Sequence, residues 1–460
     1  MKTRLSIIPA VLLAVLLTAG ACRKDAGTER TPFPDKDAEV KDSAWWASKT
    51  YPYISLTTTG EIVGPTSHGK DVDKSSYYVP GRMLVNDPDG FYSDSALVEA
   101  TLLIRWRGHS TLTCEKKSYR IKLDEKHRLL DMNSDRDWYL LANHPDKTLM
   151  RNMVAMRISK ICGMDWTPKM KPVEVWFNGD YIGNYMLSEH KEVNDNKVNI
   201  HPAGPKDIEG EALTGDYYFE IESDMDQPAG FWTPVYREPV MFRDPEEPVQ
   251  EQIDYCREYF TAFEKALRDG DFSGDAPREY LNYIDLDSFV NHYIVQEFCK
   301  PVDVLRKSTF LTKTRGGKLA FCHVWDFDLA LGNCSYLHAD PGAEDGPEGW
   351  WVKTIAPWRM KTGWYLRLFE DPQFCTAVKA RWNEVKGDLA GLPDYIDKLQ
   401  MKHRRSFDRN FERWPVIGTN IWPNSWPEED LPTSYDGEVE LLRNFCIQRL
   451  KWLDENINKL

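Results

Sequence analysis

The stretch Val324-Trp325-Asp326-Phe327-Asp328-Leu329-Ala330-Leu331-Gly332-Asn333 places two carboxylates inside an apolar run that ends at Gly-Asn. Side chains alternate between the two faces of a strand, so Asp326 and Asp328 are expected on one face and the aromatic rings on the other. Two anions on one face repel each other and resist burial. A metal ion relieves both costs, and oxygen ligands suit Mg²⁺. For an isolated Asp-x-Asp, however, the simpler interpretation is a pair that caps the following turn.

The first residues of the chain form a signal for export. A basic start at Met1–Arg4 is followed by an apolar run from Leu5 to Leu17, and then by small residues that end directly at Cys22. This order is typical of a secretory signal, and the run is shorter than the ~20 residues that a membrane span needs. Small residues ending at a cysteine resemble a bacterial lipobox, which implies cleavage before Cys22 and lipidation of that residue. The alternative is an ordinary signal with a chance cysteine.

These features predict an exported protein that is lipid-anchored to the bacterial cell envelope, on its periplasmic or surface face. Residues 1–21 are the expected lipoprotein signal peptide. Residues 22–45 are mostly polar, which is typical of a flexible tether. The net charge of −14 argues against nucleic acid as a partner and against a basic membrane-binding patch, so the lipid anchor is the expected membrane contact.

A hairpin near residue 110 carries a candidate phosphate-binding lysine. Leu102–Trp106 and Lys117–Leu123 are predicted strands joined by a polar turn that contains glycine. Alternation places Lys117 on the same face as Ile121 and Leu123, which favour the interior. An inward lysine on a strand after a glycine-bearing turn is the arrangement that kinases use to hold ATP phosphates. Taken alone, the hairpin is more typical of an edge hairpin whose lysines reach out to solvent.

Two glutamates follow the next predicted elements. A helix is expected from about residue 149 to 162, then a strand at Val173–Phe177 and a return strand at Tyr181–Leu187 after an Asn-Gly turn. Glu189 and Glu192 come next. Either could pair with Lys117, as a kinase lysine pairs with a glutamate, or could be a solvated charge at the end of a strand.

A third carboxylate lies on a loop upstream of the aspartate pair. Residues 250–267 and 285–299 have the periodicity of helices, and Pro301 ends the second. Asp303 is therefore expected on a loop, followed by strands at 309–314 and 319–326. In kinases a loop aspartate accepts the substrate's hydroxyl proton and a later aspartate holds Mg²⁺. The order matches, although neither HRD nor DFG is present.

With these residues assembled, the chain resembles the CotH kinase family, named for spore-coat protein H. The features that carry the resemblance are Arg107-Gly108-x-Ser110, Lys116-Lys117-Ser118-Tyr119, Arg151-Asn152, Asn178-Gly179-x-Tyr181-x-Gly183-x-Tyr185, Glu189, Asp303 with Ser308, Trp325-Asp326-Phe327-Asp328 and Gly332. Together they span roughly residues 105 to 381, and their order is more specific than any single motif.

The resemblance implies an α+β, atypical protein-kinase-like fold with a β-rich N-terminal part and a helical C-terminal part. It implies ATP as donor, Mg²⁺ or Mn²⁺ as cofactor, and Ser or Thr of an unidentified protein as acceptor. The expected divisions are a β-rich lead-in at 46–100, the kinase-like domain at 101–390 and a helical extension at 391–460. Helices are predicted at about 374–389, 393–411 and 439–457.

The resemblance also implies roles for individual residues. Nucleotide binding falls to Lys117, Arg107, Ser110 and Glu189, of which Lys117 contacts the phosphates and Glu189 is its ion-pair partner. Asp303 is the implied catalytic base. Asp326 holds the metal, with Asp328 and Ser308 assisting. The family often has Asn where this chain has His109, and Asn or Ser at the position of Ser308.

Two other functions fit the same sequence. One is a non-catalytic surface lipoprotein on a degenerate kinase-like fold, which uses its 17 tryptophans to contact glycans or proteins. The other is a metal-dependent hydrolase or phosphotransferase that uses Asp326 and Asp328 with a different donor. The kinase requires Lys117, Asp303 and Asp326 to converge.

Overall fold

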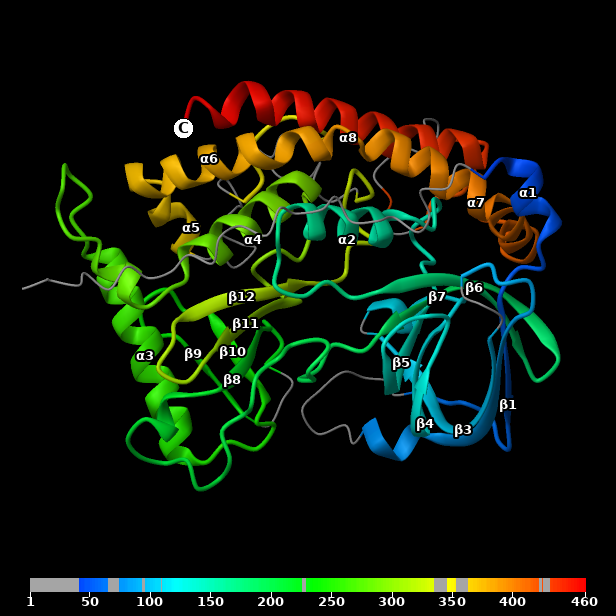
Figure 1. Cartoon of the computed structure of the whole chain (residues 1–460), viewed down its shortest axis with the longest axis horizontal. Helices are drawn as coiled ribbons and strands as arrows, with labels where there is room; N and C mark the ends of the chain where they lie inside the picture. The colour runs from blue at the N-terminus through cyan, green and yellow to red at the C-terminus, as the bar shows by residue number, and fades with distance from the viewer. Residues whose placement is uncertain are drawn as a thin grey trace, which may run out of the picture. The chain divides into compact units, whose positions relative to one another are not determined.

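The computed structural model describes residues 41–460 except 65–73, 93–95, 109, 226–228, 335–345, 353–362, 422–423 and 425–430. The predicted signal peptide, Cys22, most of the tether and His109 lie outside these residues. The described chain is α+β, with two sheets and eight α-helices (Figure 1). Within the described residues, none of the helices combines the length and apolarity that a membrane crossing requires.

The first sheet closes on itself as a barrel. Its strands are β1 (Tyr53–Thr58), β2 (Val79–Asp87), β3 (Ala96–Arg107), β4 (Ser118–Arg128), β5 (Ser134–Leu141), β6 (Met170–Phe177) and β7 (Asp180–Glu189), in the order β1-β2-β3-β4-β5-β7-β6. Parallel pairing of β1 with β6, with Tyr53 opposite Glu174, closes the barrel. Alternate side chains such as Ile104 and Ile121 point inward and are fully buried. The expected lead-in therefore supplies barrel strands, and the expected boundary at residue 100 falls inside β3.

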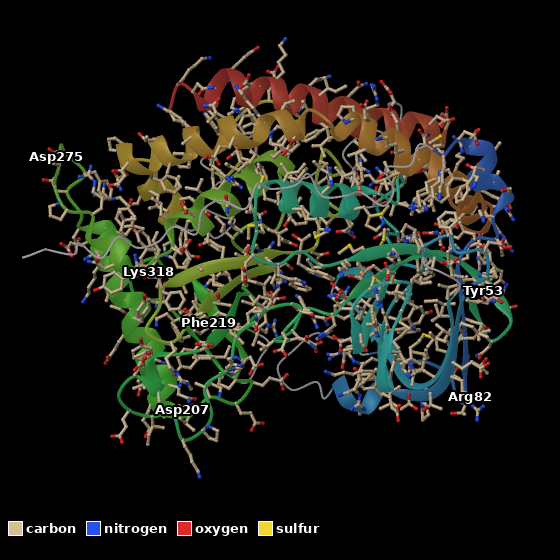
Figure 2. All side chains as sticks on the ribbon, in the orientation of Figure 1. Tyr53, Arg82, Asp207, Phe219, Asp275 and Lys318 are labelled. Carbon is tan, nitrogen blue, oxygen red and sulfur yellow. The ribbon has the colours of Figure 1, made fainter. Side chains whose placement is uncertain are left out.

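The second sheet has two faces with different neighbours. It contains β8 (Tyr217–Ile221), β9 (Gly230–Trp232), β10 (Pro239–Asp244), β11 (Thr309–Lys313) and β12 (Leu319–Val324), in the antiparallel order β12-β11-β8-β10-β9. Phe219 (labelled in Figure 2) and Phe321 are on one face, where they meet Phe260 of α3 (Gln250–Arg268) and Phe289 of α4 (Leu286–Cys299). The other face carries Glu220 next to Phe310 and is free of these helices.

The remaining helices stack on α4 and on the barrel. They are α1 (Ser43–Ser48), α2 (Arg151–Ile161), α5 (Gly363–Leu368), α6 (Pro372–Leu389), α7 (Leu392–Arg413) and α8 (Tyr435–Ile457). Helices α2, α6 and α8 pack on α4, which itself packs on β12, while α7 packs on β7. The helices expected from residue 374 onward are thus confirmed to within a few residues, and they cover both sheets.

A buried lysine ties α7 to the barrel. The side chain of Lys116 is buried, and its Nζ donates to the backbone carbonyls of Ala142 (2.9 Å) and Asn184 and to Oδ1 of Asn410 on α7 (2.9 Å). The ring of Tyr185 lies 4.6 Å from Nζ. Three acceptors and an aromatic face replace the water that an ammonium group loses on burial. All the N–H donors of Lys116 are therefore used to hold the fold.

Replacing Lys116 with Met is expected to lower the free energy of unfolding by about 3 kcal/mol, because the change leaves buried acceptors unpaired. Chemical denaturation measures the difference. The neighbouring substitution Lys117→Met is the matched control and is expected to cost less than about 1 kcal/mol, since Lys117 is half-buried and donates to one carbonyl. Equal losses in the two variants would contradict the structural role of Lys116.

Candidate functional site

The aspartate pair lies on a loop and not, as expected, at the end of a strand. Strand β12 ends at Val324, and Asp326 has a left-handed backbone conformation with φ of 71°. Aspartate tolerates this conformation, which bends the chain out of the sheet. The predicted strand end at Asp326 is therefore wrong. The predicted separation of rings from carboxylates persists, because Trp325 and Phe327 are buried whereas Asp326 is exposed.

Helix α2 holds this loop in place. The side-chain oxygen of Asn152 accepts a hydrogen bond from the backbone N–H of Phe327 at 2.9 Å, between the two aspartates. The amide of Asn152 donates to Oδ1 of Asn143 at 3.3 Å, so both ends of this buried group are used. Asn333 donates to the backbone oxygen of Asp328 at 2.7 Å. Two amides thus fix the direction in which the loop leaves β12.

Asp303 lies on a second tight loop, between α4 and β11. Its backbone oxygen accepts hydrogen bonds from the N–H groups of Arg306 (3.0 Å) and Lys307 (2.9 Å). Its carboxylate is 3.7 Å from the guanidinium of Arg306. Ser308, the implied metal-loop residue, directly precedes β11 and has φ of 51°. The predicted loop position of Asp303 is therefore confirmed.

The two loops bring three carboxylates into electrostatic contact. Burial, followed by the negative charges of Asp326, Asp146 and Asp303, raises the pKa of Asp328 well above its ordinary value, and Arg107 opposes the shift. Burial and the charge of Asp326 likewise raise the pKa of Asp303. Asp303 and Asp328 therefore hold protons more tightly than isolated aspartates do, and a nearby cation would lower their energy.

Both loops contain residues in a strained backbone conformation. Non-glycine residues with positive φ between positions 300 and 331 are Lys300, Leu305, Ser308, Asp326 and Leu331. Leucine has no side-chain oxygen to compensate for this conformation, which costs about 1 kcal/mol or more per residue. Such strain persists where surrounding contacts hold a loop in a required shape, and it concentrates at functional sites.

Two cationic side chains reach the same place from the barrel. The guanidinium of Arg107, at the end of β3, lies 4.4 Å from the ring of Tyr139 and 5.9 Å from that of Trp325. Lys191, just past β7, has its Nζ 5.5 Å from the ring of Trp325. Its partner is Glu220 on β8, at 3.5 Å. The predicted residue Arg107 is thus beside the aspartate loop, together with Lys191, which the sequence analysis missed.

Lys117 and Glu189, the predicted ion pair, are not brought together. Nζ of Lys117 donates to the backbone oxygen of Leu112 at 2.6 Å and lies 5.2 Å from the ring of Trp106. The buried carboxylate of Glu189 accepts a hydrogen bond from the N–H of Lys169 at 2.9 Å. The sequence predicted a strand that begins at Lys117, whereas β4 begins one residue later, at Ser118. Ser110 begins a short 3₁₀ turn over Ser110–Thr113.

Asp326 and Asp328 fit a metal ion whose remaining ligands are water and substrate phosphates. In the described ranges, no three His, Cys, Asp or Glu side chains are grouped to bind one ion. Mg²⁺ is commonly held by one or two carboxylates together with water and substrate phosphates. Asp326 and Asp328 would supply those carboxylates, and the raised pKa of Asp328 marks the unfavourable charge that the ion would neutralise.

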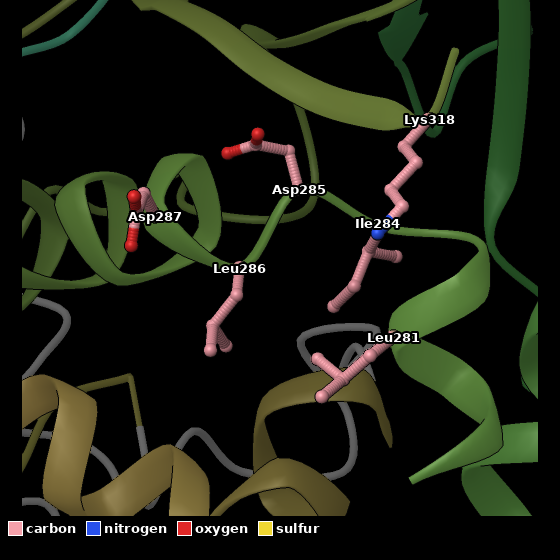
Figure 3. Close-up of a pocket in the computed structure, with 6 residues that line it drawn as sticks. All are labelled: Leu281, Ile284, Asp285, Leu286, Asp287 and Lys318. Carbon is pink, nitrogen blue, oxygen red and sulfur yellow. The ribbon is translucent and has the colours of Figure 1, made fainter. Parts of the chain in front are cut away.

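A cavity of about 210 Å³ opens elsewhere, at the N-terminus of α4 (Figure 3). It is lined by Leu281, Ile284, Asp285, Leu286, Asp287 and Lys318. Asp285 is occupied as a helix cap, accepting from the N–H of Ser288 at 2.7 Å. Helix α4 separates this cavity from the Asp303 loop by its whole length, roughly 20 Å. The cavity is therefore not part of the aspartate site.

Comparison with known protein families identifies a match over most of the chain. A family model described as CotH kinase protein matches residues 104–453, which include both aspartate loops and all the helices from α2 to most of α8. A search of curated proteins finds none that matches this chain.

Ionisation of the buried Asp328 is expected to lower the free energy of unfolding as the pH rises, and Asp328→Asn should remove this effect. Because the folded-state pKa of Asp328 is raised, its contribution to stability is present at low pH and is lost as the pH rises above the ordinary value of 3.8. In EDTA, the free energy of unfolding of Asp328→Asn minus that of wild type should therefore increase by about 1–3 kcal/mol from pH 5 to pH 8. Denaturant unfolding at both pH values measures this gain, and a pH-independent difference would contradict it.

Asn152→Ala is expected to weaken Mn²⁺ binding about tenfold, because the loop that carries the two aspartates loses its hydrogen bond to α2. The measurement is the Mn²⁺ concentration that gives half of the metal-induced rise in Tm. Asn184→Ala is the matched control, since Asn184 is also a buried asparagine and donates to Ser406 at 2.9 Å, away from the aspartates. If both variants shift the Mn²⁺ requirement equally, Asn152 has no special role.

Proposed function

The chain belongs to the CotH kinase family, and we propose that it transfers the γ-phosphate of ATP to serine or threonine hydroxyls of a protein. The observation that carries the proposal is that the acids of two separate loops interact electrostatically. Asp303 and the Asp326–Asp328 pair are separated in sequence by the β11–β12 hairpin, yet their charges act on one another. This is the order and grouping of acids that phosphoryl transfer requires.

Asp303 is the proposed general base. Its carboxylate would accept the proton of the acceptor hydroxyl, and its raised pKa makes it a stronger base than an ordinary aspartate. Arg306 beside it limits the shift and orients the carboxylate. The tight loop and its strained neighbours hold the group in one direction, so little reorganisation is needed when the hydroxyl arrives.

Asp326 and Asp328 are the proposed ligands of Mg²⁺ or Mn²⁺. The metal, when bound, would neutralise charge on the phosphates and polarise the bond that breaks. Asn152 fixes the loop between the two carboxylates, and Arg107 lies beside Trp325 and acts on Asp328, with no ion pair within 4 Å among the described residues. Arg107 can therefore turn its free N–H groups to a phosphate.

We also propose that the protein acts outside the cytoplasm, anchored through a lipid on Cys22. The support is the order of basic, apolar and small residues before that cysteine. Such a location requires a nucleotide donor in the envelope or at the cell surface. A non-catalytic glycan- or protein-binding role has less support, because no tryptophan within the described ranges is exposed.

The test uses the soluble mature chain that begins after Cys22, with radiolabelled ATP and either Mg²⁺ or Mn²⁺. Autophosphorylation is expected in wild type. Asp303→Ala should reduce it at least a hundredfold through loss of the base, and Asp326→Asn should do so through loss of a metal ligand. Asp275→Asn, which removes an exposed acid remote from both loops in sequence, should leave it unchanged.

The outcomes separate the candidate functions. Nucleotide binding without transfer, even with added protein acceptors, would contradict the kinase and indicate a binding protein on this fold. Metal binding and phosphoester hydrolysis without selectivity for ATP would favour the metal-dependent hydrolase. Failure to bind nucleotide with either metal would remove the kinase proposal altogether.

A further inference from the structure

Three lysines near the site differ in what their ammonium groups can still bind. All the N–H donors of Lys116 are taken up by protein acceptors, and Lys117 donates to the carbonyl of Leu112. Lys191 makes an ion pair with Glu220 and, within the described part of the chain, no hydrogen bond. Lys191 therefore keeps more N–H donors for a ligand than Lys117, which uses one, or Lys116, which uses all three.

Lys191 also lies between the two functional loops. Its Nζ is 4.2 Å from the ring of Phe310, which is the second residue of β11 and follows the Asp303 loop. It is 5.5 Å from the ring of Trp325, the residue before Asp326. The charge of Asp326 acts on Lys191 directly. A ligand that bridges the two loops would meet this ammonium group.

The charges around Lys191 favour an anion. Glu220 is almost completely buried and forms ion pairs with both Arg243 and Lys191. The positive charges of Arg243 and Arg107 also act on Lys191, and the charge of Asp326 opposes them. The Lys191 side chain is mostly buried, with 17% of its surface exposed. In such a setting a phosphate oxygen interacts more strongly with the ammonium than it would in water.

We propose that Lys191, oriented by Glu220, binds the phosphates of the nucleoside triphosphate, in the place that the sequence resemblance assigned to Lys117. This inference rests on the proposed function and names the phosphate-binding residue of the same site. The Glu220 carboxylate holds the lysine against β8, near the rings of Phe310 and Trp325. Arg107, also beside Trp325, is the second cation that the phosphates would meet.

Isothermal titration with a non-hydrolysable ATP analogue in Mn²⁺ tests the assignment. Lys191→Met is expected to weaken analogue binding at least tenfold and to leave the affinity for adenosine unchanged, because adenosine carries no phosphate. Lys117→Met is the matched control and should alter both affinities by less than twofold. Glu220→Gln keeps the lysine but weakens its tether, so it should give a smaller loss than Lys191→Met. Thermal unfolding of each variant checks that the fold is kept.

The reverse result, a large loss in Lys117→Met and none in Lys191→Met, would overturn the inference and leave the kinase proposal standing. A second probe, inorganic tripolyphosphate with Mn²⁺, distinguishes failure of the kinase proposal from failure of the Lys191 assignment. If wild type does not bind the ATP analogue but binds tripolyphosphate in a Lys191-dependent way, the kinase proposal fails and the phosphate role of Lys191 holds. Binding of neither probe by wild type would overturn both.

Discussion

Repulsion among carboxylates is the constraint that governs the centre of this molecule. Asp303, Asp326 and Asp328 are held on two loops, and burial followed by the charge of Asp326 raises the pKa of both Asp303 and Asp328. The surrounding structure supplies what keeps them there. Asn152 ties one loop to α2, backbone turns close the other, and the cations Arg107 and Lys191 approach from the barrel. A site assembled against repulsion in this way stores electrostatic energy that a bound cation would release.

Local elements of the fold were predictable because they depend on local periodicity. Helix α3 was expected at 250–267 and occurs at Gln250–Arg268, and the loop position of Asp303 followed from Pro301. The end of β12 was misplaced by two residues, since alternation cannot register the left-handed turn at Asp326. Barrel closure was not foreseen either, because the parallel pairing of β1 with β6 is a long-range choice that strand patterns do not encode.

The predicted site residues likewise divide into those that local sequence reveals and those that depend on long-range contacts. The acids were found because Asp-x-Asp and a loop aspartate are visible in the sequence as types and spacings. The choice among Lys116, Lys117 and Lys191 could not be made from the sequence, because it depends on which acceptors each Nζ meets in three dimensions. Nothing in the sequence links Glu220 of β8 to Lys191, which comes from the barrel. The sequence shows the type of each residue, whereas the fold determines which side chains contact one another.

The parallel pairing that closes the barrel also determines when the domain can become complete during synthesis. Strand β1 leaves the ribosome more than a hundred residues before β6, its closing neighbour, so one of its edges stays unpaired through the synthesis of all the strands between them. An exposed strand edge is a template for pairing with other chains. Nascent chains that stop before residue 170 would carry an open sheet, and the cell's chaperones would have to shield that edge until translation passes β6.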